Sequence, residues 1–447
     1  MGYSRRKFIQ NAAGSTAAIA LSAYLPKFSA ASYNRIIGAN DMIRVASMGV
    51  NSRGLAVTKN FARQKGCEIL YVCDVDKRAA EKCIKTVSDL TGTTPKNQPD
   101  FRKALEDKNV DVLMVAAPDH WHAPAAILGC KAGKHIYVEK PCSHNPNEGE
   151  ILVKAADKYK RVVQMGNQRR SWPNLVNAIN EIKNGAIGKP YYAKCWYTNN
   201  RASIGIGKAT PVPGWLDFDL WQGPAPRRQF KDNLLHYNWH WFWHWGTGEA
   251  LNNGVHMVDL ARWGLGVDYP KKVTSFGGRY CFKDDWETPD TQIINLDFGS
   301  KGVISWEGRS CNPAPIEGAT TGVIFYGDKG SLMIDAGNSY KIIDNNKNII
   351  KDVKHTENID ATNLQNPSEI LDAGHIINFF NGIRKNEKLH SPINEGHIST
   401  LLVQLGNISV RTGSTLHINP ANGHILNNAA ANKLWSRQYQ PGWEVKV

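Results

Sequence analysis

A glycine-rich turn joins the first apolar strand expected in this chain, Ile43–Met48, to a segment with helical spacing. The turn reads Gly49-Val50-Asn51-Ser52-Arg53-Gly54, a GxGxxG pattern with asparagine in the middle position. Gly49 permits the tight turn, Gly54 lets helix and strand approach closely, and Asn51 tolerates positive φ better than most residues. A strand, turn and helix of this kind open a doubly wound parallel sheet and direct backbone amides at a phosphate.

A second strand ends in the sequence CDVD and supplies an acid at the expected distance from this turn. Asp74 lies about 25 residues beyond Gly49, near the spacing of an acid that hydrogen-bonds a ribose. Such an acid favours NAD over NADP because it repels a 2′-phosphate. Arg53 and Arg78 lie nearby in sequence, and their positive charges could weaken the repulsion of the 2′-phosphate of NADP. The alternative is a βα turn in a doubly wound domain of another function.

Polar residues gather where the following apolar strands end. One strand runs up to Pro118, a second up to Glu139, and a third precedes Asn167. Ligands of parallel sheets bind beyond the carboxyl ends of the strands. We therefore expect a site that includes Asp119, His120, His122, Glu139, Lys140, Asn167, Gln168 and Arg169.

The second half of the chain has a different pattern, with longer alternating strands in TSFGGRYCF, TQIINLDFG, GVISWEGRS and GVIFYGDKGSLMID. Several such strands in succession indicate an open, mostly antiparallel sheet. The predicted fold class is α/β: a Rossmann-type doubly wound parallel sheet, followed by an α+β domain with a large open sheet.

The N-terminus carries the pattern of a twin-arginine export signal. Arg5 and Arg6 stand in SRRKFI, a modest apolar run follows, and Ser29-Ala30-Ala31 offers a cleavage site. The alternatives are a basic amphipathic helix or a lipid-facing anchor. The run is too short and too rich in small residues for a stable span of about 20 apolar residues. We expect residues 1–31 to be removed and a folded protein to reach the periplasm.

The composition argues against some classes of binding partner. The net charge of +14 is spread along the chain without a Lys/Arg block, so a nucleic-acid partner is not expected. The eight cysteines show neither a CxxC motif nor the spacing of a disulfide framework, and no metal cluster is expected. We expect no membrane contact of the mature protein.

The motifs GVNSRG, CDVD, APDHWHAP, YVEKP and MGNQRR together resemble the Gfo/Idh/MocA oxidoreductase family, which includes glucose–fructose oxidoreductase and inositol dehydrogenase. The resemblance covers nearly the whole mature chain. It implies that Lys140, the lysine of EKP, lies beside the nicotinamide and the reacting carbinol. The alternative for Lys140 is a lysine on a surface loop. The cofactor-binding residues implied are Gly49, Asn51, Ser52, Arg53, Gly54, Asp74, Arg78, Pro118, Asp119, His122, Glu139, Lys140 and Gln168.

The same resemblance places a second catalytic residue at the start of a later helix. Related dehydrogenases have Asp-x-Gly-x-His there, the histidine acting as general base. This chain has Asn252-Asn253-Gly254-Val255-His256, so the histidine is kept and the acid is replaced by asparagine. We expect Lys140 and His256 to be catalytic, although loss of the carboxylate weakens the basicity of His256. The alternative for His256 is a structural role in the helix.

The segment HYNWHWFWHWGTGE, residues 236–249, is unusually aromatic. Its alternating tryptophans suggest an extended stretch that separates its three histidines from the geometry of a metal site. We expect a sugar-binding wall; the alternative is a tryptophan-rich core. Arg169, Arg170 and Trp172 are expected opposite this wall. The expected substrate-binding residues are Lys140, Arg169, Trp241, His244, Asn252, Asn253 and His256.

Three functions remain open. The first is a periplasmic oxidoreductase that transfers a hydride between tightly bound NAD and a hydroxyl-bearing carbon of a sugar or glycoside. The second is an NAD-dependent glycoside hydrolase that acts by transient C3 oxidation, elimination, hydration and reduction, as some family members do; their Thr-His-Gly stretch is missing here. The third is a non-catalytic sugar sensor or scaffold.

The expected organisation has three parts: a signal peptide over 1–31, an NAD-binding Rossmann domain over 41–167, and a C-terminal α/β substrate-binding and oligomerisation domain over 168–447. The expected partners are a carbohydrate substrate, the twin-arginine export machinery and further copies of the chain.

Overall fold

A parallel sheet of six strands forms the first half of the fold, in the order β3-β2-β1-β4-β5-β6. The computed structural model describes residues 42–335, 337–355 and 369–447, so the expected export signal lies outside the described residues. The strands are β1 (Ile43–Met48), β2 (Cys67–Cys73), β3 (Lys96–Asn97), β4 (Val112–Val115), β5 (His135–Val138) and β6 (Val163–Met165). The helices between them are α3 (Arg53–Ala62), α4 (Lys77–Thr91), α5 (Phe101–Glu106), α6 (Asp119–Lys131) and α7 (Pro146–Tyr159). This is the Rossmann order, with a reversal between β1 and β4 where ligands bind.

Burial on both faces of the sheet explains why the sequences of these strands are continuously apolar. Every residue of β4 is buried, and so is all of β6. The helices pack on both faces of the sheet and form two separate apolar clusters with it. A strand covered on both faces has no solvent side, so its sequence does not alternate.

The second sheet has ten strands in the order β14-β13-β12-β11-β7-β10-β9-β8-β15-β16. Its strands are β7 (Pro190–Thr198), β8 (Lys272–Gly278), β9 (Thr291–Asp297), β10 (Val303–Arg309), β11 (Thr321–Gly327), β12 (Gly330–Ile334), β13 (Tyr340–Asp344), β14 (Ile349–Val353), β15 (Leu416–Ile418) and β16 (Ile425–Leu426). Among the pairings resolved between these strands, β7 with β10 is parallel and the others are antiparallel. The predicted fold class is confirmed.

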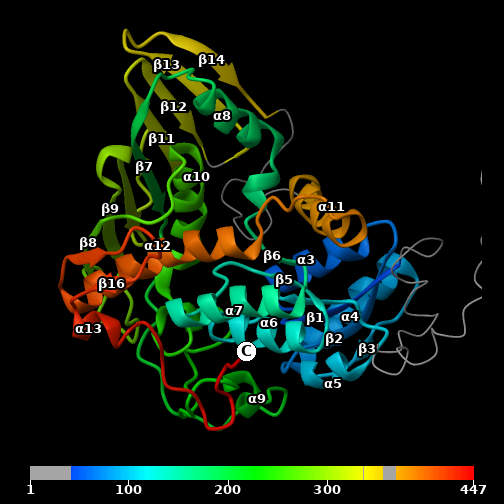
Figure 1. Cartoon of the computed structure of the whole chain (residues 1–447). Coiled ribbons are helices and arrows are strands. Elements are labelled where there is room, and N and C mark those ends of the chain that lie inside the picture. The colour runs from blue at the N-terminus through cyan, green and yellow to red at the C-terminus, as the bar shows by residue number, and fades with distance from the viewer. Residues whose placement is uncertain (1–41, 336, 356–368) are drawn as a thin grey trace, which may run out of the picture. The chain divides into compact units, whose positions relative to one another are not determined.

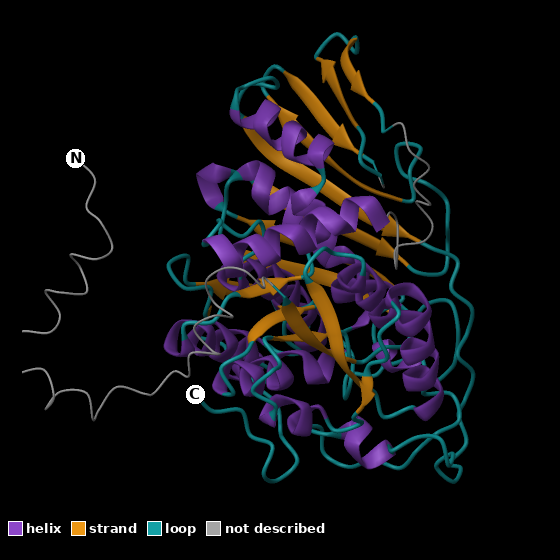
Figure 2. Ribbon diagram, turned by 90° about the vertical axis from the view of Figure 1, so that its right-hand side faces the viewer, coloured by secondary structure: helices purple, strands orange, loops and turns teal. Residues whose placement is uncertain are grey.

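Helices cover one face of the large sheet, as Figures 1 and 2 show. They are α8 (Pro173–Lys183), α10 (Val255–Leu265) and α12 (Ile393–Thr412). Residues of β9 alternate accordingly, with Ile294 and Leu296 buried and Ile293 exposed. Phe276, which pairs with Ile293 in the sheet register, is also exposed, so the sheet presents apolar side chains away from its helices.

The remaining helical elements are short or lie at the edges of the sheets. They are α9 (Phe218–Gln222), α11 (Glu369–Lys385), α13 (Ala429–Asn432), the 3₁₀ turns η1 (Gln168–Ser171), η2 (Asn238–Trp241) and η4 (Gly299–Lys301), and the π-helical turn η3 (Ala250–Gly254). In the described part of the chain, no helix is both long and apolar enough to cross a bilayer.

Residues 199–245, here called the cover segment, run from the large sheet to the Rossmann strand ends. A β-bridge joins Leu216 to Asp76 just after β2, and the N–H of Lys77 donates to the carbonyl of Trp215 at 3.0 Å. Figure 1 shows the C-terminal stretch running past α9 of this segment. There Gln440 donates its backbone N–H to a carbonyl of the cover segment at 3.0 Å.

The aromatic segment was expected to be extended, and this prediction is wrong. Residues 238–241 form the 3₁₀ turn η2, because the rings stack within the fold instead of alternating across a strand. Trp239 stacks on His240 with 3.6 Å between ring centroids, and Trp241 stacks on Trp286 at 4.0 Å.

A buried ion pair ties the end of the Rossmann sheet to α10. Two nitrogens of Arg170 donate to the Asp259 carboxylate at 2.8 and 2.9 Å, with both side chains almost fully buried. Ser399 of α12 also donates to Asp259, at 2.5 Å. Three elements therefore depend on one carboxylate.

We expect Asp259→Asn to lower the free energy of unfolding by about 3–5 kcal/mol. The buried guanidinium of Arg170 then keeps only its longer contact with the carboxylate of Glu395, at 3.5 Å. The exposed pair between Lys85 and Asp89 supplies the control, and Lys85→Met should leave stability unchanged within error. Denaturant titration of both variants measures the difference; equal midpoints would contradict a structural role for the buried pair.

Candidate active site

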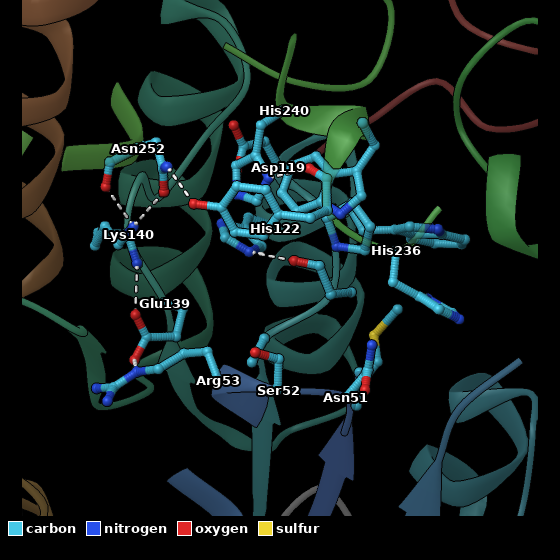
Figure 3. Close-up of a pocket in the computed structure, with 18 of the residues that line it drawn as sticks. Asn51, Ser52, Arg53, Asp119, His122, Glu139, Lys140, His236, His240 and Asn252 are labelled. Carbon is cyan, nitrogen blue, oxygen red and sulfur yellow. Dashed lines mark hydrogen bonds and ion pairs between the residues drawn. The ribbon is translucent and has the colours of Figure 1, made fainter. Parts of the chain in front are cut away.

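One cavity of about 400 Å³ lies where the Rossmann strand ends, the cover segment and the turn η3 meet. Most residues predicted from the sequence line it: Gly49, Asn51, Ser52, Arg53, Asp74, Pro118, Asp119, His122, Glu139, Lys140, Gln168, Arg169, Asn252, Asn253 and His256. Figure 3 shows how the side chains of this group face one another. The strand-end clustering expected from the sequence thus produces a single site.

The glycine turn forms one end of the cavity and fits a dinucleotide. Gly49 has a φ of +74°, and a Cβ there would lie 2.5 Å from the backbone nitrogen of Ala117. A Cβ on Gly54 would lie 1.8 Å from the carbonyl oxygen of Gly49. The turn therefore accepts no larger residue at either position, and the start of α3 opens onto the cavity at Ser52. A helix N-terminus of this kind stabilises a pyrophosphate.

Asp74 lies beside this turn, at the end of β2. Its two carboxylate oxygens accept the backbone N–H groups of Val50 at 2.7 Å and of Asp76 at 2.9 Å. Burial raises the pKa of Asp74, although these two hydrogen bonds oppose the shift. Each oxygen keeps a lone pair for a hydroxyl, as a ribose partner requires.

Glu139 organises the middle of the cavity. It accepts from Arg53 at 3.1 Å and from Gln168 at 2.8 Å, and Arg53 also pairs with Asp372 of α11 at 2.9 Å. These contacts hold the end of β5 next to the start of α3 (Figure 3). Glu139 thus fixes the backbone that carries Lys140.

Lys140 points from the end of β5 toward the turn η3. Its Nζ donates to the backbone oxygen of Asn252 at 2.5 Å and lies 3.3 Å from the Oδ1 of the same residue. Burial lowers the pKa of Lys140, while the carboxylates of Glu139 and Asp119 oppose the shift. A buried lysine with a lowered pKa can exchange a proton with a bound hydroxyl.

His256 faces the same cavity but stays neutral. Burial holds the pKa of His256 well below its usual value, and the positive charges of Arg169, Lys140 and Arg53 add to the effect. Its buried Nδ1 has no hydrogen-bond partner among the described residues. A neutral imidazole can hydrogen-bond a hydroxyl, but its lowered pKa makes His256 a weak base here.

A polar wall closes the other end of the cavity. Arg201 pairs with Glu249 at 2.5 Å, and Glu249 also accepts from Asn253 at 2.5 Å. The hydroxyl of Tyr237 accepts from the Nδ2 of Asn252 at 3.1 Å. The carboxylate nearest the NNGVH motif therefore neutralises an arginine and is not bonded to the motif's histidine.

Several expected residues lie outside the cavity. Trp241 is buried against Trp286, and the Nε2 of His244 lies 2.7 Å from the carbonyl oxygen of Pro226, so neither reaches a substrate there. Arg170 pairs with Asp259 instead of facing the site.

Four further strand-end and turn residues support the cavity from outside. Gly54 packs beneath the turn, and the Nε2 of His120 lies 2.9 Å from a carbonyl oxygen of the cover segment. Arg78 stacks on Trp215 at 3.4 Å, outside the cavity lining. Asn167 precedes η1 and is also absent from the lining.

The three histidines of the aromatic segment do not converge. His236 lies 2.7 Å from the carboxylate of Asp76, and His240 lies 2.6 Å from the carbonyl oxygen of Tyr237. With His244 bonded to the carbonyl of Pro226, each ring faces a different group.

Sequence reasoning missed part of the lining. The missed residues that the site uses are Tyr197, Asn199, Arg201, Tyr237, His240 and Asp372. Tyr237 and His240 belong to the aromatic segment, whose composition marked the region but not the individual residues. Arg201 and Asp372 stand in no recognisable motif.

Family models match most of the chain. Residues 43–167 match the oxidoreductase family with an NAD-binding Rossmann fold, and residues 179–418 match the C-terminal α/β domain of the same family. A relative from Shewanella pealeana, named a glycosyl hydrolase family 109 protein, is 26% identical over 214 residues, which are 44% of this chain and 46% of the relative. A relative from Shewanella baltica with the same name is 27% identical over 209 residues, 43% of this chain and 45% of that protein. The chain thus aligns with about half the length of these curated relatives.

Solved structures share the fold at low identity. A levoglucosan dehydrogenase in complex with NADH and levoglucosan has a TM-score of 0.64 at 17% identity, covering 84% of this chain and 99% of its own. The WlbA dehydrogenase from Bordetella pertussis, in complex with NADH and UDP-GlcNAcA, has a TM-score of 0.63 at 19% identity, covering 86% and 99%. The two domain matches show that the chain belongs to the Gfo/Idh/MocA family of oxidoreductases and carries its NAD-binding Rossmann domain.

Proposed function

We propose that this protein oxidises or reduces a hydroxyl-bearing carbon of a sugar or glycoside with a tightly bound NAD. The observation that carries the proposal is Lys140, whose amine is buried in the same cavity as the dinucleotide turn. When bound, NAD supplies the acceptor or donor of a hydride. The residues of the chain position the substrate and manage its hydroxyl proton.

Lys140 is the proton carrier in this proposal. In its neutral form it accepts the hydroxyl proton of the substrate as the carbinol is oxidised, and in its charged form it returns that proton. The hydrogen bond from Nζ to Asn252 holds the amine in place. His256, kept neutral by its surroundings, positions the hydroxyl.

The polar wall supports a polyhydroxylated substrate. Arg201 and Asn253 present donors, while Tyr237 and Asn199 offer both donors and acceptors. A sugar satisfies such a wall better than an apolar alcohol, because unpaired buried polar groups are costly. The sugar ligands named for the levoglucosan and WlbA dehydrogenases agree with this substrate class.

The cover segment supports retention of the cofactor. It contacts the start of α4 through the stacking of Arg78 on Trp215, and the β2–α4 loop through the contact of His236 with Asp76. Burial raises the pKa of Asp76, but hydrogen bonds from Arg78 outweigh it and leave that pKa lowered, so Asp76 is an anion. A cofactor held beneath such a cover can accompany a folded protein through the twin-arginine export machinery to the periplasm, as Arg5 and Arg6 suggest.

The exposed face of the large sheet supports assembly into a homo-oligomer. Phe276 and Ile293 pair directly in the sheet register, and both are exposed. Exposed apolar surface marks interaction sites in soluble proteins.

A second candidate function is a glycoside hydrolase with transient oxidation. It is favoured by the curated relatives, which are named glycosyl hydrolase family 109 proteins. In that case the same Lys140 serves the oxidation and the final reduction, and elimination of the aglycone lies between them. The net products are a free sugar and the aglycone, with no change of redox state.

We expect the purified protein to carry NAD and to show a rise in near-ultraviolet absorbance when one member of a glycoside panel is added without cofactor. The rise reports a stoichiometric half-reaction in the bound cofactor. Release of an aglycone without a lasting rise would identify the hydrolase instead. A folded, active protein that contains no nucleotide would refute both candidates.

Lys140→Met should lower the rate of sugar oxidation by about 10²–10⁴-fold, the range for loss of a positioned acid–base group. Because burial lowers the pKa of Lys140 below 10.5, the oxidation rate of the unaltered protein should rise with pH and level off above that pKa. The exposed Lys131 supplies the control, and Lys131→Met should keep both rate and profile. An unchanged pH profile in Lys140→Met would contradict the assignment.

Trp215→Ala should speed the release of bound NAD about tenfold, because it removes the stacking of Arg78 that holds the cover segment closed. Exchange against labelled NAD measures the rate. Trp243→Ala is the matched control, since Trp243 lies in the same segment but contacts Arg411. Equal exchange rates in the two variants would mean that the cover segment does not retain the cofactor.

A further inference from the structure

Two cysteines outside the candidate active site meet at one end of the large sheet. Cys281 follows β8 and Cys311 follows β10, the two strands that flank β9. In the sheet register, Gly278 of β8 and Arg309 of β10 both pair with Thr291, the first residue of β9. The two segments therefore leave the sheet at the same level, which brings thiols distant in sequence together.

Asp290 fixes the backbone on both sides. Its Oδ2 accepts the N–H groups of Tyr280 at 2.9 Å and Cys281 at 3.1 Å, and its carbonyl accepts the N–H of Ser310 at 2.8 Å. The Sγ atoms of Cys281 and Cys311 and a carboxylate oxygen of Asp290 all lie within 4.8 Å of one another. Cys281 is exposed and Cys311 is half-buried, so a reagent reaches the pair from solvent.

The same three side chains offer ligand types for a metal ion, but the carboxylate is already engaged. Arg279 donates to its Oδ2 at 3.0 Å, in addition to the two backbone groups, and Thr291 donates to its Oδ1 at 2.9 Å. A divalent cation would have to displace these donors and would be repelled by the guanidinium. The two thiols need only close the gap between their sulfurs to about 2.05 Å.

We propose that Cys281 and Cys311 form a reversible disulfide when the protein meets a disulfide-bearing oxidant. Exposed Cys281, as thiolate, attacks one sulfur of the oxidant; a mixed disulfide forms and one thiolate leaves. The thiolate of Cys311 then attacks the Sγ of Cys281, which closes the bond and expels the second thiolate. Two electrons pass to the oxidant, and the two cysteine protons end on its leaving thiolates.

The disulfide would restrain the residues of the polar wall and makes no contact with Lys140. Ser310, next to Cys311, donates to Glu249 at 3.3 Å and accepts the backbone N–H of Arg201 at 2.7 Å. On the other segment, Glu287 donates its N–H to the carbonyl of Trp241 at 3.0 Å. A crosslink therefore joins the segment that holds Arg201 and Glu249 to the segment that holds Trp241, whose ring lies 4.9 Å from the guanidinium of Arg201. The inference rests on this geometry and does not depend on the proposed activity.

The buried cysteines serve as internal references for the oxidation of Cys281 and Cys311. Cys73, Cys83, Cys130, Cys142 and Cys195 are buried. These five thiols are shielded from solvent, whereas Cys281 is exposed and Cys311 is half-buried, so access separates the pair from the references.

The test equilibrates the purified chain with mixtures of reduced and oxidised glutathione, followed by acid quenching, alkylation and peptide mass mapping. We expect one crosslinked pair of peptides containing Cys281 and Cys311, with two thiols lost to alkylation. The thermal midpoint of the oxidised form should exceed that of the reduced form by about 4 °C, since the bond closes a loop of about 30 residues.

Cys311→Ser should give a glutathione adduct on Cys281 with no crosslink and no gain in midpoint. Cys67→Ser, which removes a half-buried cysteine elsewhere, is the control and should keep the crosslink. Separate alkylation of Cys281 and Cys311 at every glutathione ratio would overturn the proposal. Uptake of one zinc ion that protects both thiols from alkylation and from oxidation would overturn it in favour of a metal site.

Discussion

The hydrogen bond from the buried amine of Lys140 to the backbone carbonyl of Asn252 is the interaction on which the site depends. It joins the end of β5 to the turn η3, so the two sheets must be in place before the amine is fixed. The π-helical hydrogen bonding of η3 differs from that of α10, which follows it, and such turns recur at functional sites.

The charges around this amine support the proposal that Lys140, and not His256, carries the proton. Lys140 has the carboxylates of Glu139 and Asp119 as neighbours, whereas His256 is surrounded by cations that disfavour a further positive charge. Glu249 pairs with Arg201 and not with His256, which agrees with the proposal that Lys140 carries the proton.

The sequence predicted the Rossmann half well because each of its short apolar strands ends at a polar or proline-containing turn, and these ends meet at one edge. Lys140 and Asp74 were found for this reason. The strand order of the large sheet could not be predicted, since β7 pairs with β10 and β11 across long stretches of chain. Arg201 comes from an irregular segment without a pattern. Trp241 was misassigned because composition alone cannot distinguish a ring that packs on a sugar from one that packs on Trp286.

The cover segment completes the cavity, which neither sheet encloses alone. It contacts the β2–α4 loop and the C-terminal stretch. In the C-terminal stretch, Trp443 packs on Trp121 with 5.1 Å between ring centroids. Trp121 in turn lines the cavity. Segments far apart in the chain must therefore fold before the cavity is complete. Export of an already folded chain, as the N-terminal arginines suggest, would preserve a cofactor acquired before export.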